Sequence, residues 1–509
     1  MTTQTAPVDV ILADHGLTAS LDDVAGYITR QRWSGAQGMR IERTTVDDAA
    51  VLLHDDAVSL LFSVVHVMFE GGRERRYALP LGLRAAGDPL AERAPAFIIG
   101  PQPDGRLLYD ALGDPAYVHL LWQAIRQHRT IPTAQGLLRC EPYDSAALED
   151  TDTPWMRVLT VEQSNTSMEL GDRTFVKHLR RIEAGPSHEL EMASTLSRAG
   201  FSHVPPVYAA ILYDAGPVTD APVVIVQPFL RNTSDGWVLA LTSLRDLYAD
   251  AEEALANGAH DVERVVAEQG GAFTGEASRL GRVIAEMHAT LAAAHAPGIR
   301  AEPVTRTHLE RWAGSMSADL DRLLAAHSSQ LDELRRHEGH IRSQFAALRA
   351  LRPSGLCTRI HGDLHLGQTL RIDTGWVILD FEGEPDRGAE ERRELSSPLR
   401  DVAGMLRSFD YAAAVALTER LMPESADWEG MMAFGDEWAR QNRAAFWTAY
   451  VQAVAGTSLL PDGDDAVLMR RAFELQKAVY EVGYEMGHRP TWAGIPLRFL
   501  LRGDDAARN

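Results

Sequence analysis

The segment HGDLHLGQ, residues 361–368, constrains this chain more than any other part of its sequence. An apolar run, residues 376–379, follows it and ends at Asp380 in the tripeptide DFE. Phosphoryl transfer needs a carboxylate that orients and deprotonates the acceptor hydroxyl, a second carboxylate on Mg²⁺, and a further oxygen ligand for that ion. Asp363, Asp380 and Gln368 can supply these three functions from strand ends and tight turns.

The spacing of these residues agrees with the kinase template, in which an Asn ligand follows the catalytic Asp by five residues and a metal-binding Asp comes later. Here Gln368 follows Asp363 by five residues and Asp380 comes twelve further on. Gln replaces Asn, but its amide oxygen is still a hard donor that suits Mg²⁺. The pattern predicts a magnesium-dependent kinase with Asp363 as the catalytic base and with Gln368 and Asp380 as metal ligands.

The two histidines of this segment admit two interpretations. We interpret His361 and His365 as hydrogen-bonding members of the loop, a common use of buried imidazoles. The alternative makes them ligands, with Asp363, of a transition metal in a hydrolase. That alternative leaves the DFE tripeptide and an upstream lysine unexplained.

The upstream lysine is Lys177, in the run TFVKHL, where a charge in the middle of a strand is otherwise unfavourable. Such a lysine can hold the α- and β-phosphates of ATP. In the helical segment that follows, Glu191 is the preferred ion-pair partner and Glu189 is the alternative. A solvated lysine at a strand edge is the simpler explanation and stays open.

A polar turn, QSNTS, occupies the place of a phosphate-covering loop between the first two strands of this region. It lacks the glycines of a GxGxxG loop, but backbone amides and hydroxyl groups can also cradle phosphate oxygens. Its candidate nucleotide contacts are Gln163, Ser164, Asn165, Thr166 and Ser167. Without its neighbours, such a segment would simply be a turn.

Near the C-terminus, polar aromatic and charged residues recur at helical offsets of 0, 3, 4, 7 and 8, which places them on one face. Sugars pack their ring faces on aromatic side chains and hydrogen-bond to charged groups. An ordinary packed or solvated helix face is the alternative. The candidate acceptor contacts are Lys477, Tyr480, Glu481, Tyr484 and Glu485, with Arg489 and Trp492 just beyond.

Composition limits the partners and the compartment. The formal net charge of −21 over 509 residues argues against an extended basic surface for nucleic acid or anionic lipid, so a small neutral or cationic substrate fits better. Cys140 and Cys357 can form neither a disulfide framework nor a zinc site, which indicates the reducing cytoplasm. We expect no membrane anchor, because no secretory signal or run of 18 apolar residues occurs.

The order of patterns predicts an α+β chain in which sheet-rich segments precede a mainly helical part. Residues 1–90 resemble a small sheet-containing module, and residues 91–150 are interpreted as a connecting segment. Short alternating runs at 157–162, 168–170 and 173–178 predict antiparallel strands, with a hairpin at Gly171-Asp172. A helix at 188–199 and a strand at 223–229 would complete this lobe. From residue 231 the pattern is mostly helical, although 251–275 and 315–345 could be helices or loops.

Six motifs along the chain resemble the actinobacterial maltokinases, within the aminoglycoside-phosphotransferase-like kinases. The resemblance covers most of the chain and is specific, because chance agreement in this order is very unlikely. The motifs are QRW, EQSNTS, HGDLHLGQ, ILDFEGEP, PLRDVAGMLRSFDYA and KAVYEVGYE, the last followed by RPTW and IPL.

The resemblance implies a bilobal, eukaryotic-protein-kinase-like fold with an N-terminal sheet-containing cap at 1–90. An intermediate segment and ATP-binding lobe would span 91–230, and a helical lobe 231–509. It implies transfer of the γ-phosphoryl group of ATP to the anomeric hydroxyl of maltose, with Gln227 to Phe229 at the adenine. The wider group also contains kinases for glucosamine and other acceptors. A functional link to trehalose synthase is a further expectation.

Overall fold

The computed structural model describes residues 6–15, 17, 21–148, 155–159, 164–231, 233–256, 261–269, 271–296, 298–327, 330–384 and 387–502. The chain forms two compact units. Unit 1 comprises Met1–Ser194 and Pro205–Arg231, and unit 2 comprises Thr195–Val204 and Asn232–Asn509.

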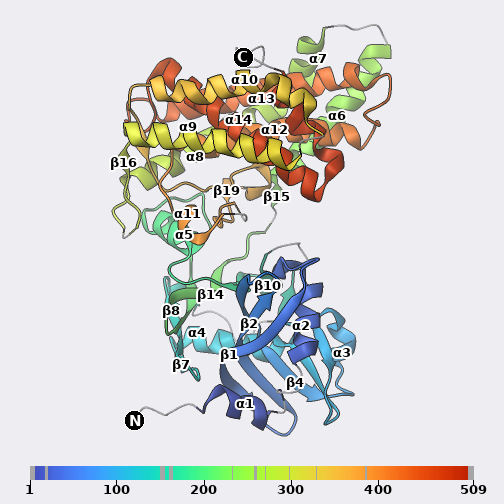
Figure 1. Cartoon of the computed structure of the whole chain (residues 1–509), viewed down its shortest axis with the longest axis vertical. Helices are drawn as coiled ribbons and strands as arrows, with labels where there is room; N and C mark the ends of the chain where they lie inside the picture. Colours follow the sequence, from blue (N-terminus) through green and yellow to red (C-terminus); the bar gives the residue numbers. More distant parts are fainter. Residues whose placement is uncertain are drawn as a thin grey trace. The chain divides into compact units, whose positions relative to one another are not determined.

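The first sheet of unit 1 is built on a long antiparallel hairpin of β1 and β2 (Figure 1). Helices α1 (Val8–Asp14) and α2 (Leu21–Arg30) contact β1 and bury their apolar residues in a shared core. In sheet order the strands are β12 (Arg181–Ile182), β3 (Glu74–Ala78), β2 (Val58–Phe69), β4 (Leu81–Ala85), β6 (Arg106–Asp110) and β5 (Ile98–Pro101), with β1 (Ile41–His54) paired to β2.

The second sheet of unit 1 carries the strands that the alternating runs predict. Strand β10 pairs antiparallel with β9 and β11, and β11 pairs with β14, so this part of the prediction is confirmed, except that residues 160–162 of the first predicted strand lie outside the described residues. Gly171 and Asp172 both have positive φ in the turn between β10 and β11. In sheet order the strands are β7 (Thr130–Pro132), β8 (Leu137–Pro142), β13 (Ala209–Ala215), β14 (Val218–Pro228), β11 (Thr174–His178), β10 (Thr166–Leu170) and β9 (Met156–Val158).

The interpretation of residues 91–150 as a connecting segment is wrong. Strands β5 and β6 join the first sheet, and β7 and β8 join the second. Between them, α4 (Pro115–Arg126) starts at the N-cap Asp114 and packs on β8 and β13. The remaining α-helices of unit 1 in the described residues are α3 (Leu90–Arg93) and α5 (His188–Arg198), the latter ending across the boundary with unit 2.

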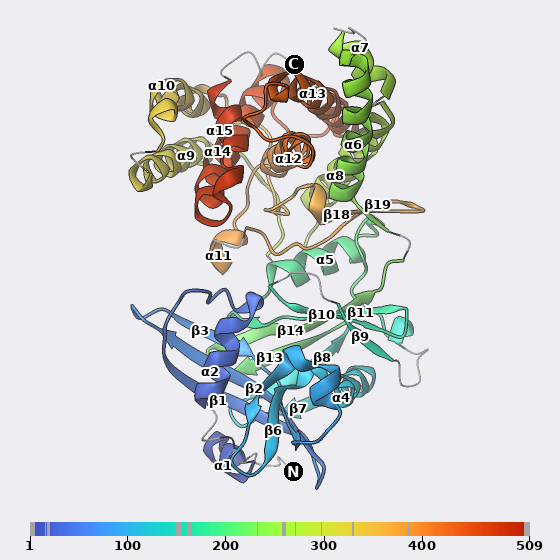
Figure 2. The same cartoon turned by 90° about the vertical axis from the view of Figure 1, so that its right-hand side faces the viewer.

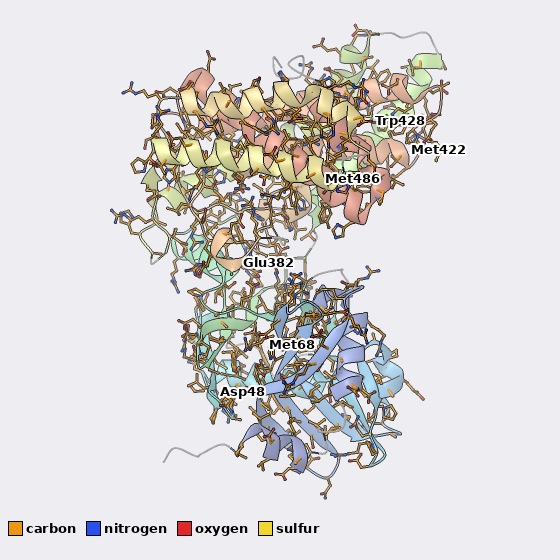
Figure 3. All side chains as sticks on the ribbon, in the orientation of Figure 1. Asp48, Met68, Glu382, Met422, Trp428 and Met486 are labelled. Atoms are coloured by element: carbon orange, nitrogen blue, oxygen red, sulfur yellow. The ribbon has the colours of Figure 1, made fainter. Side chains whose placement is uncertain are left out.

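One buried carboxylate ties the two sheets of unit 1 together. Asp48, labelled in Figure 3, lies at a register shift of β1 and is fully buried. Its carboxylate accepts hydrogen bonds from the Thr133 hydroxyl at 2.5 Å, the Tyr213 hydroxyl at 2.8 Å and the backbone amide of Gln135 at 2.9 Å. Since Tyr213 belongs to β13, this carboxylate joins the first sheet to the second.

Unit 2 is a helical assembly around α12, which contacts α6, α13 and α14 (Figure 2). The stretches at 251–275 and 315–345, left open between helix and loop, are mostly helical. The helices are α6 (Gly236–Ala256), α7 (Val262–Gln269), α8 (Gly271–Ala293), α9 (Arg306–Ala326), α10 (Asp332–Ala347), α11 (Ala389–Arg392), α12 (Leu399–Thr418), α13 (Trp428–Ala453), α14 (Gly463–His488) and α15 (Gly494–Leu501). No helix in the described ranges is both long and apolar enough to span a membrane.

Small strand pairs in unit 2 flank the segment HGDLHLGQ. Strands β18 (Thr369–Ile372) and β19 (Gly375–Ile378) form a hairpin, and β15 (Ser234–Asp235) pairs with β18. A second pair joins β16 (Glu302–Pro303) to β17 (Leu356–Cys357). The segment HGDLHLGQ therefore enters β18 directly, and Asp380 comes just after β19.

We expect Asp48→Ala to lower the free energy of unfolding by about 3 kcal/mol or more, because a hydrogen bond to a charged group contributes roughly 1.5–3 kcal/mol. Urea unfolding followed by circular dichroism measures the change. The neighbouring Asp47→Ala is the control, since Asp47 is partly exposed and pairs with Arg76 at the surface. Asp47→Ala should lower the free energy of unfolding by less than about 1 kcal/mol. Equal losses in both variants would contradict the structural role of Asp48.

Candidate active site

Lys177 lies in the interior of β11, opposite Ser167 of β10 on one side and Ile225 of β14 on the other. Directly opposite residues of antiparallel strands share a face of the sheet. By the same register, Phe175 and Gln227 are opposite each other on that face. Predicted nucleotide contacts from three strands are thus gathered on one surface of the second sheet.

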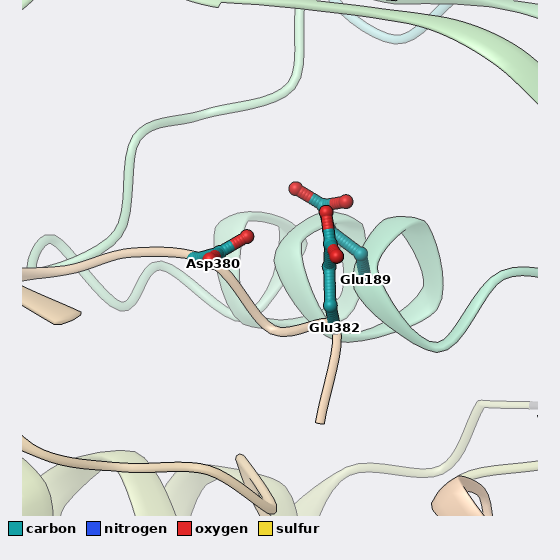
Figure 4. A group of neighbouring side chains, drawn as sticks. All are labelled: Glu189, Asp380 and Glu382. Atoms are coloured by element: carbon teal, nitrogen blue, oxygen red, sulfur yellow. The ribbon is translucent and has the colours of Figure 1, made fainter. Parts of the chain in front are cut away.

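The ammonium of Lys177 is buried and forms an ion pair with Glu189 at 2.8 Å. The preference for Glu191 is therefore corrected in favour of the alternative. Both acids lie in the first turn of α5, but residues two apart on a helix point in directions about 200° apart. The strand lysine meets the face that carries Glu189, which Figure 4 shows on α5.

The turn before β10 is described only in part, and Gln163 lies outside the described residues. Ser164 accepts a hydrogen bond from the side-chain amide of Asn165. The hydroxyl of Thr166 accepts from the guanidinium of Arg180 at 2.8 Å, so this side chain points away from the face that carries Lys177. Ser167, the next residue, lies on the same face of the sheet as Lys177.

Arg180 belongs to a buried cluster that the sequence reasoning missed. Its guanidinium pairs with Asp110 at 2.6 Å, and neither side chain is exposed. Tyr27 donates to the same carboxylate at 3.0 Å, and Trp33 lies 4.6 Å from the guanidinium carbon. Burial, and then the negative charge of Asp110, raise the pKa of Tyr27. No spacing rule could connect residues so far apart in the chain.

The remaining predicted nucleotide contacts are at the end of β14. The side-chain amide of Gln227 donates to the carbonyl of Pro205 at 3.1 Å. The backbone amide of Phe229 donates to the carbonyl of Arg173 at 2.7 Å. These bonds fix the backbone where the strand leaves the sheet.

In unit 2 the HGDLHLGQ loop is fixed by Asp401 of α12. Its carboxylate accepts from the backbone amides of His361 at 2.6 Å and Gly362 at 2.9 Å. His288 contacts the same carboxylate at 3.1 Å, and its other ring nitrogen meets the hydroxyl of Tyr450. All three side chains are buried, so the loop is anchored in the helical core.

Glycine is required where this loop meets its neighbours. Gly362 has φ +87°, and a Cβ there would lie 3.2 Å from the Cα of Gly383. On α12, a Cβ at Gly404 would lie 2.6 Å from the carbonyl oxygen of Leu364. Larger residues at these positions would push the loop away from its support.

Both histidines of the loop hydrogen-bond to backbone groups. His361 contacts the carbonyl of Leu379 at 2.8 Å, and His365 accepts from the amide of Gly367 at 3.1 Å. Burial lowers the pKa of His365, which favours the neutral imidazole needed to accept that bond. These contacts support the interpretation of both residues as loop-forming groups.

Asp380 and Gln368 lie together at the ends of the β18–β19 hairpin. The side-chain amide of Gln368 donates to the carboxylate of Asp380 at 3.1 Å. Asp380 has φ +60°, a left-handed conformation that is rare for a residue with a side chain and is often found at functional sites. Figure 4 shows Asp380 and Glu382 on the segment that follows β19. A carboxylate beside an amide is an oxygen donor set that fits Mg²⁺, with the amide turned to present its oxygen.

Asp363 is held by Lys477, a residue expected to contact the acceptor. The ammonium lies 3.0 Å from Oδ1 of Asp363 and 2.9 Å from Oε1 of Glu384. Burial alone would lower the pKa of Lys477, but the two carboxylates outweigh it and raise this pKa. Glu384 is a further residue that the sequence reasoning missed, although it lies inside the quoted motif ILDFEGEP.

Glu384 is a buried carboxylate surrounded by cations. Burial would raise its pKa, but Lys477, Arg400 and Arg387 together lower it well below its usual range. Asp363 and Glu384 therefore share one ammonium, and Glu384 has a second ion pair with Arg387.

The predicted acceptor contacts do share one surface. All seven line a single cavity of about 440 Å³, which we call the α14 cavity, together with Asp363. Tyr480 and Tyr484 stack on each other, and Arg489 lies over the ring of Trp492 at 4.3 Å. Arg407 of α12 binds Glu481.

Because the folded-state pKa of Glu384 is lowered, its ionisation stabilises the fold at neutral pH. That contribution is complete above the unfolded value of about 4.3 and is lost as pH falls toward the folded value. The difference in unfolding free energy between wild type and Glu384→Gln should therefore be largest near pH 7 and shrink below about pH 4. Urea titrations across this range measure it.

Glu391→Gln is the matched control, since Glu391 also pairs with Arg387 but is half exposed. Its effect on stability should be small at every pH. A Glu384→Gln difference that does not depend on pH would contradict the charge pairing around Glu384.

The chain is similar to known proteins in sequence and in fold. The maltokinase N-terminal cap domain matches residues 27–114, which hold β1 to β6. A glucosamine kinase of Mycolicibacterium smegmatis is 28% identical over 341 residues, 67% of this chain and 77% of the relative. A glucosamine kinase of Streptacidiphilus jiangxiensis is 28% identical over 392 residues, which are 75% of this chain and 80% of the relative.

A solved glucosamine kinase, in complex with glucosamine, ADP and inorganic phosphate, superposes with a TM-score of 0.60 over 91% of this chain and 94% of its own, at 21% identity. That likeness supports the predicted α+β, kinase-like fold with a sheet-containing N-terminal part, which is confirmed. The chain is thus similar to the maltokinase cap domain at residues 27–114 and to glucosamine kinases over two thirds or more of its length.

Proposed function

We propose that this chain is an ATP-dependent sugar kinase that phosphorylates the anomeric hydroxyl of maltose to give maltose 1-phosphate. The observation that carries the proposal is the position of Asp363. Its carboxylate borders a cavity lined by tyrosines, a tryptophan and charged groups, and one of its oxygens is fixed by Lys477. A fixed carboxylate beside a sugar-sized cavity is the arrangement that a base for a sugar hydroxyl needs.

In the proposed reaction, the acceptor hydroxyl donates its proton to Asp363 while its oxygen bonds to the γ-phosphorus of ATP. The bond from that phosphorus to the β,γ-bridging oxygen breaks, and its electron pair leaves with ADP. Lys477 holds Oδ1 of Asp363, so Oδ2 is available to receive the proton. The arrangement orients the carboxylate before the acceptor binds.

Asp380 and Gln368 would hold Mg²⁺, which supplies positive charge to the phosphate oxygens. Lys177, fixed by Glu189, would contact the phosphates from unit 1, with Ser167 on the same face of the sheet. The other candidate nucleotide contacts are Gln163, Ser164, Asn165, Thr166, Gln227 and Phe229.

The acceptor has a second candidate. The match to the maltokinase cap domain favours maltose, whereas both curated relatives named above are glucosamine kinases. Mass-spectrometric detection of the product from an equimolar mixture of maltose, glucosamine, glucose and an aminoglycoside identifies reaction and acceptor together. We expect a mass increase on maltose that depends on ATP. Phosphorylation of glucosamine alone would make glucosamine, and not maltose, the acceptor. The absence of a phosphorylated product from every acceptor would overturn the kinase proposal.

Asp363→Asn should lower kcat by about three orders of magnitude or more, since the amide cannot accept the hydroxyl proton. ADP release measured with a coupled assay checks kcat, and calorimetric titration with ATP should show nearly unchanged binding. Asp373→Asn, in the exposed turn between β18 and β19, is the control and should keep wild-type turnover. Unchanged sugar-dependent ATP consumption in Asp363→Asn would refute the assignment of the base.

Removal of divalent ions with EDTA should abolish turnover, and added Mg²⁺ should restore it. Asp380→Asn should raise the Mg²⁺ concentration needed for half-maximal rate at least tenfold, because the loss of a charged ligand weakens cation binding. Titration of the rate with MgCl₂ provides the measurement. Retained activity in EDTA, or stoichiometric zinc in the purified protein, would contradict a magnesium-dependent kinase.

A further inference from the structure

A second cavity borders Asp363, and none of the assignments above uses it. It has a volume of about 530 Å³, lies between α9 and α14, and is called the α9 cavity here. It shares Asp363, Lys477, Tyr480 and Tyr484 with the α14 cavity. A ligand that reaches the catalytic carboxylate can therefore extend into either space.

The carboxylates that line the α9 cavity already have cationic partners. Asp319 accepts from Arg322 and, at 2.7 Å, from the side-chain amide of Gln476. Asp363 and Glu384 share the ammonium of Lys477, as described above. The fourth acid, exposed Glu391, pairs with Arg387. An ammonium group entering this cavity would thus meet only carboxylates that are already paired.

The exception among the charged groups of this cavity is Arg400, in the first turn of α12. Its guanidinium forms no hydrogen bond with any residue that the structure describes, and its ion pair with Glu384 is long, at 3.8 Å. The side chain is 21% exposed, and burial lowers the pKa of Arg400 despite the attraction of Glu384. A guanidinium that borders a cavity without hydrogen-bond partners from the described chain can donate to a ligand oxygen there.

We propose that Arg400 donates hydrogen bonds to an oxygen atom of the acceptor in the α9 cavity, and thereby selects neutral hydroxyl groups over an ammonium group at that position. The inference rests on the proposed function, in which the acceptor hydroxyl reacts at Asp363. A guanidinium has only donors, so it pairs with hydroxyl or anionic oxygens and repels an ammonium group. Arg400 is then a residue that determines specificity between neutral sugars and amino sugars.

Arg400→Gln should raise the KM for a neutral acceptor such as maltose by about tenfold or more, because a hydrogen bond to a charged donor is lost. The KM for ATP should stay within about twofold. For glucosamine, kcat/KM should either rise or fall by less than it does for maltose. The ratio of kcat/KM for glucosamine to kcat/KM for maltose should therefore increase at least tenfold. Arg400→Lys keeps the positive charge and should keep part of the preference for maltose.

Arg311→Gln is the matched control. Arg311 is an exposed arginine of α9 that lies outside the α9 cavity and pairs weakly with Glu394. Its substitution should leave both acceptor KM values near those of the wild type. Thermal unfolding of each variant shows whether it is folded. If Arg400→Gln does not fold, the ratio of kcat/KM for glucosamine to that for maltose in Arg400→Lys tests the proposal instead.

Failure of this inference differs from failure of the proposed function. If Arg400→Gln keeps the wild-type KM and ratio while Asp363→Asn is inactive, the kinase assignment stands and the role of Arg400 is refuted. Equal increases in the KM for both acceptors, with an unchanged ratio, would also refute selection by Arg400. A wild-type protein that phosphorylates no sugar would overturn both.

Discussion

The carboxylate of Asp401 connects the helical core of unit 2 to the HGDLHLGQ loop. It lies in the first turn of α12, whose residues are buried almost throughout by the helices around it. From there it binds two consecutive backbone amides of that loop and one ring nitrogen of His288. Burial would raise the pKa of Asp401, but these partners outweigh it and lower that pKa, so the anchor is ionised at neutral pH. This attachment fixes the start of the loop, two residues before Asp363.

A second constraint comes from the C-terminal helix. Lys477 reaches Asp363 and Glu384 from α14, more than ninety residues further along the chain. A buried ammonium between two carboxylates is costly to desolvate and is retained only with good geometry, which the two short contacts provide. The same residue lines both the α14 cavity and the α9 cavity. The orientation of Asp363 at both cavities therefore depends on one side chain.

How much of this could be predicted from the sequence depends on whether the partners are close in the chain. Asp363, Gln368 and Asp380 could be predicted as one set because the loop and hairpin keep them within eighteen positions. The strands around Lys177 followed from alternation, but the choice between Glu189 and Glu191 depends on how α5 is rotated against β11. Alternation cannot fix that rotation, because it is set by packing.

The residues that were missed share a physical feature. Asp401, Glu384 and Arg400 are defined by partners from other elements, so their roles appear only when the chain is folded. Asp401 and Arg400 lie in the quoted motif PLRDVAGMLRSFDYA, and a buried charged pair at the start of an apolar helix was the available signal. Strands β5 to β8 were missed for a similar reason, since short runs flanked by glycine and proline gain their order from distant strands.

The adjacent residues Arg400 and Asp401 show that one helix turn can favour the charge of one side chain and disfavour that of the next. Both occupy the first turn of α12, where the exposed backbone amides favour a negative charge and disfavour a positive one. Asp401 gains from that field and from its hydrogen bonds, so its charge stabilises the fold. Arg400 gains from neither, and its guanidinium borders the α9 cavity without hydrogen bonds from the described chain. A group that is poorly satisfied in the free protein is well placed to recover that energy from a ligand, because binding then supplies the contacts that folding did not.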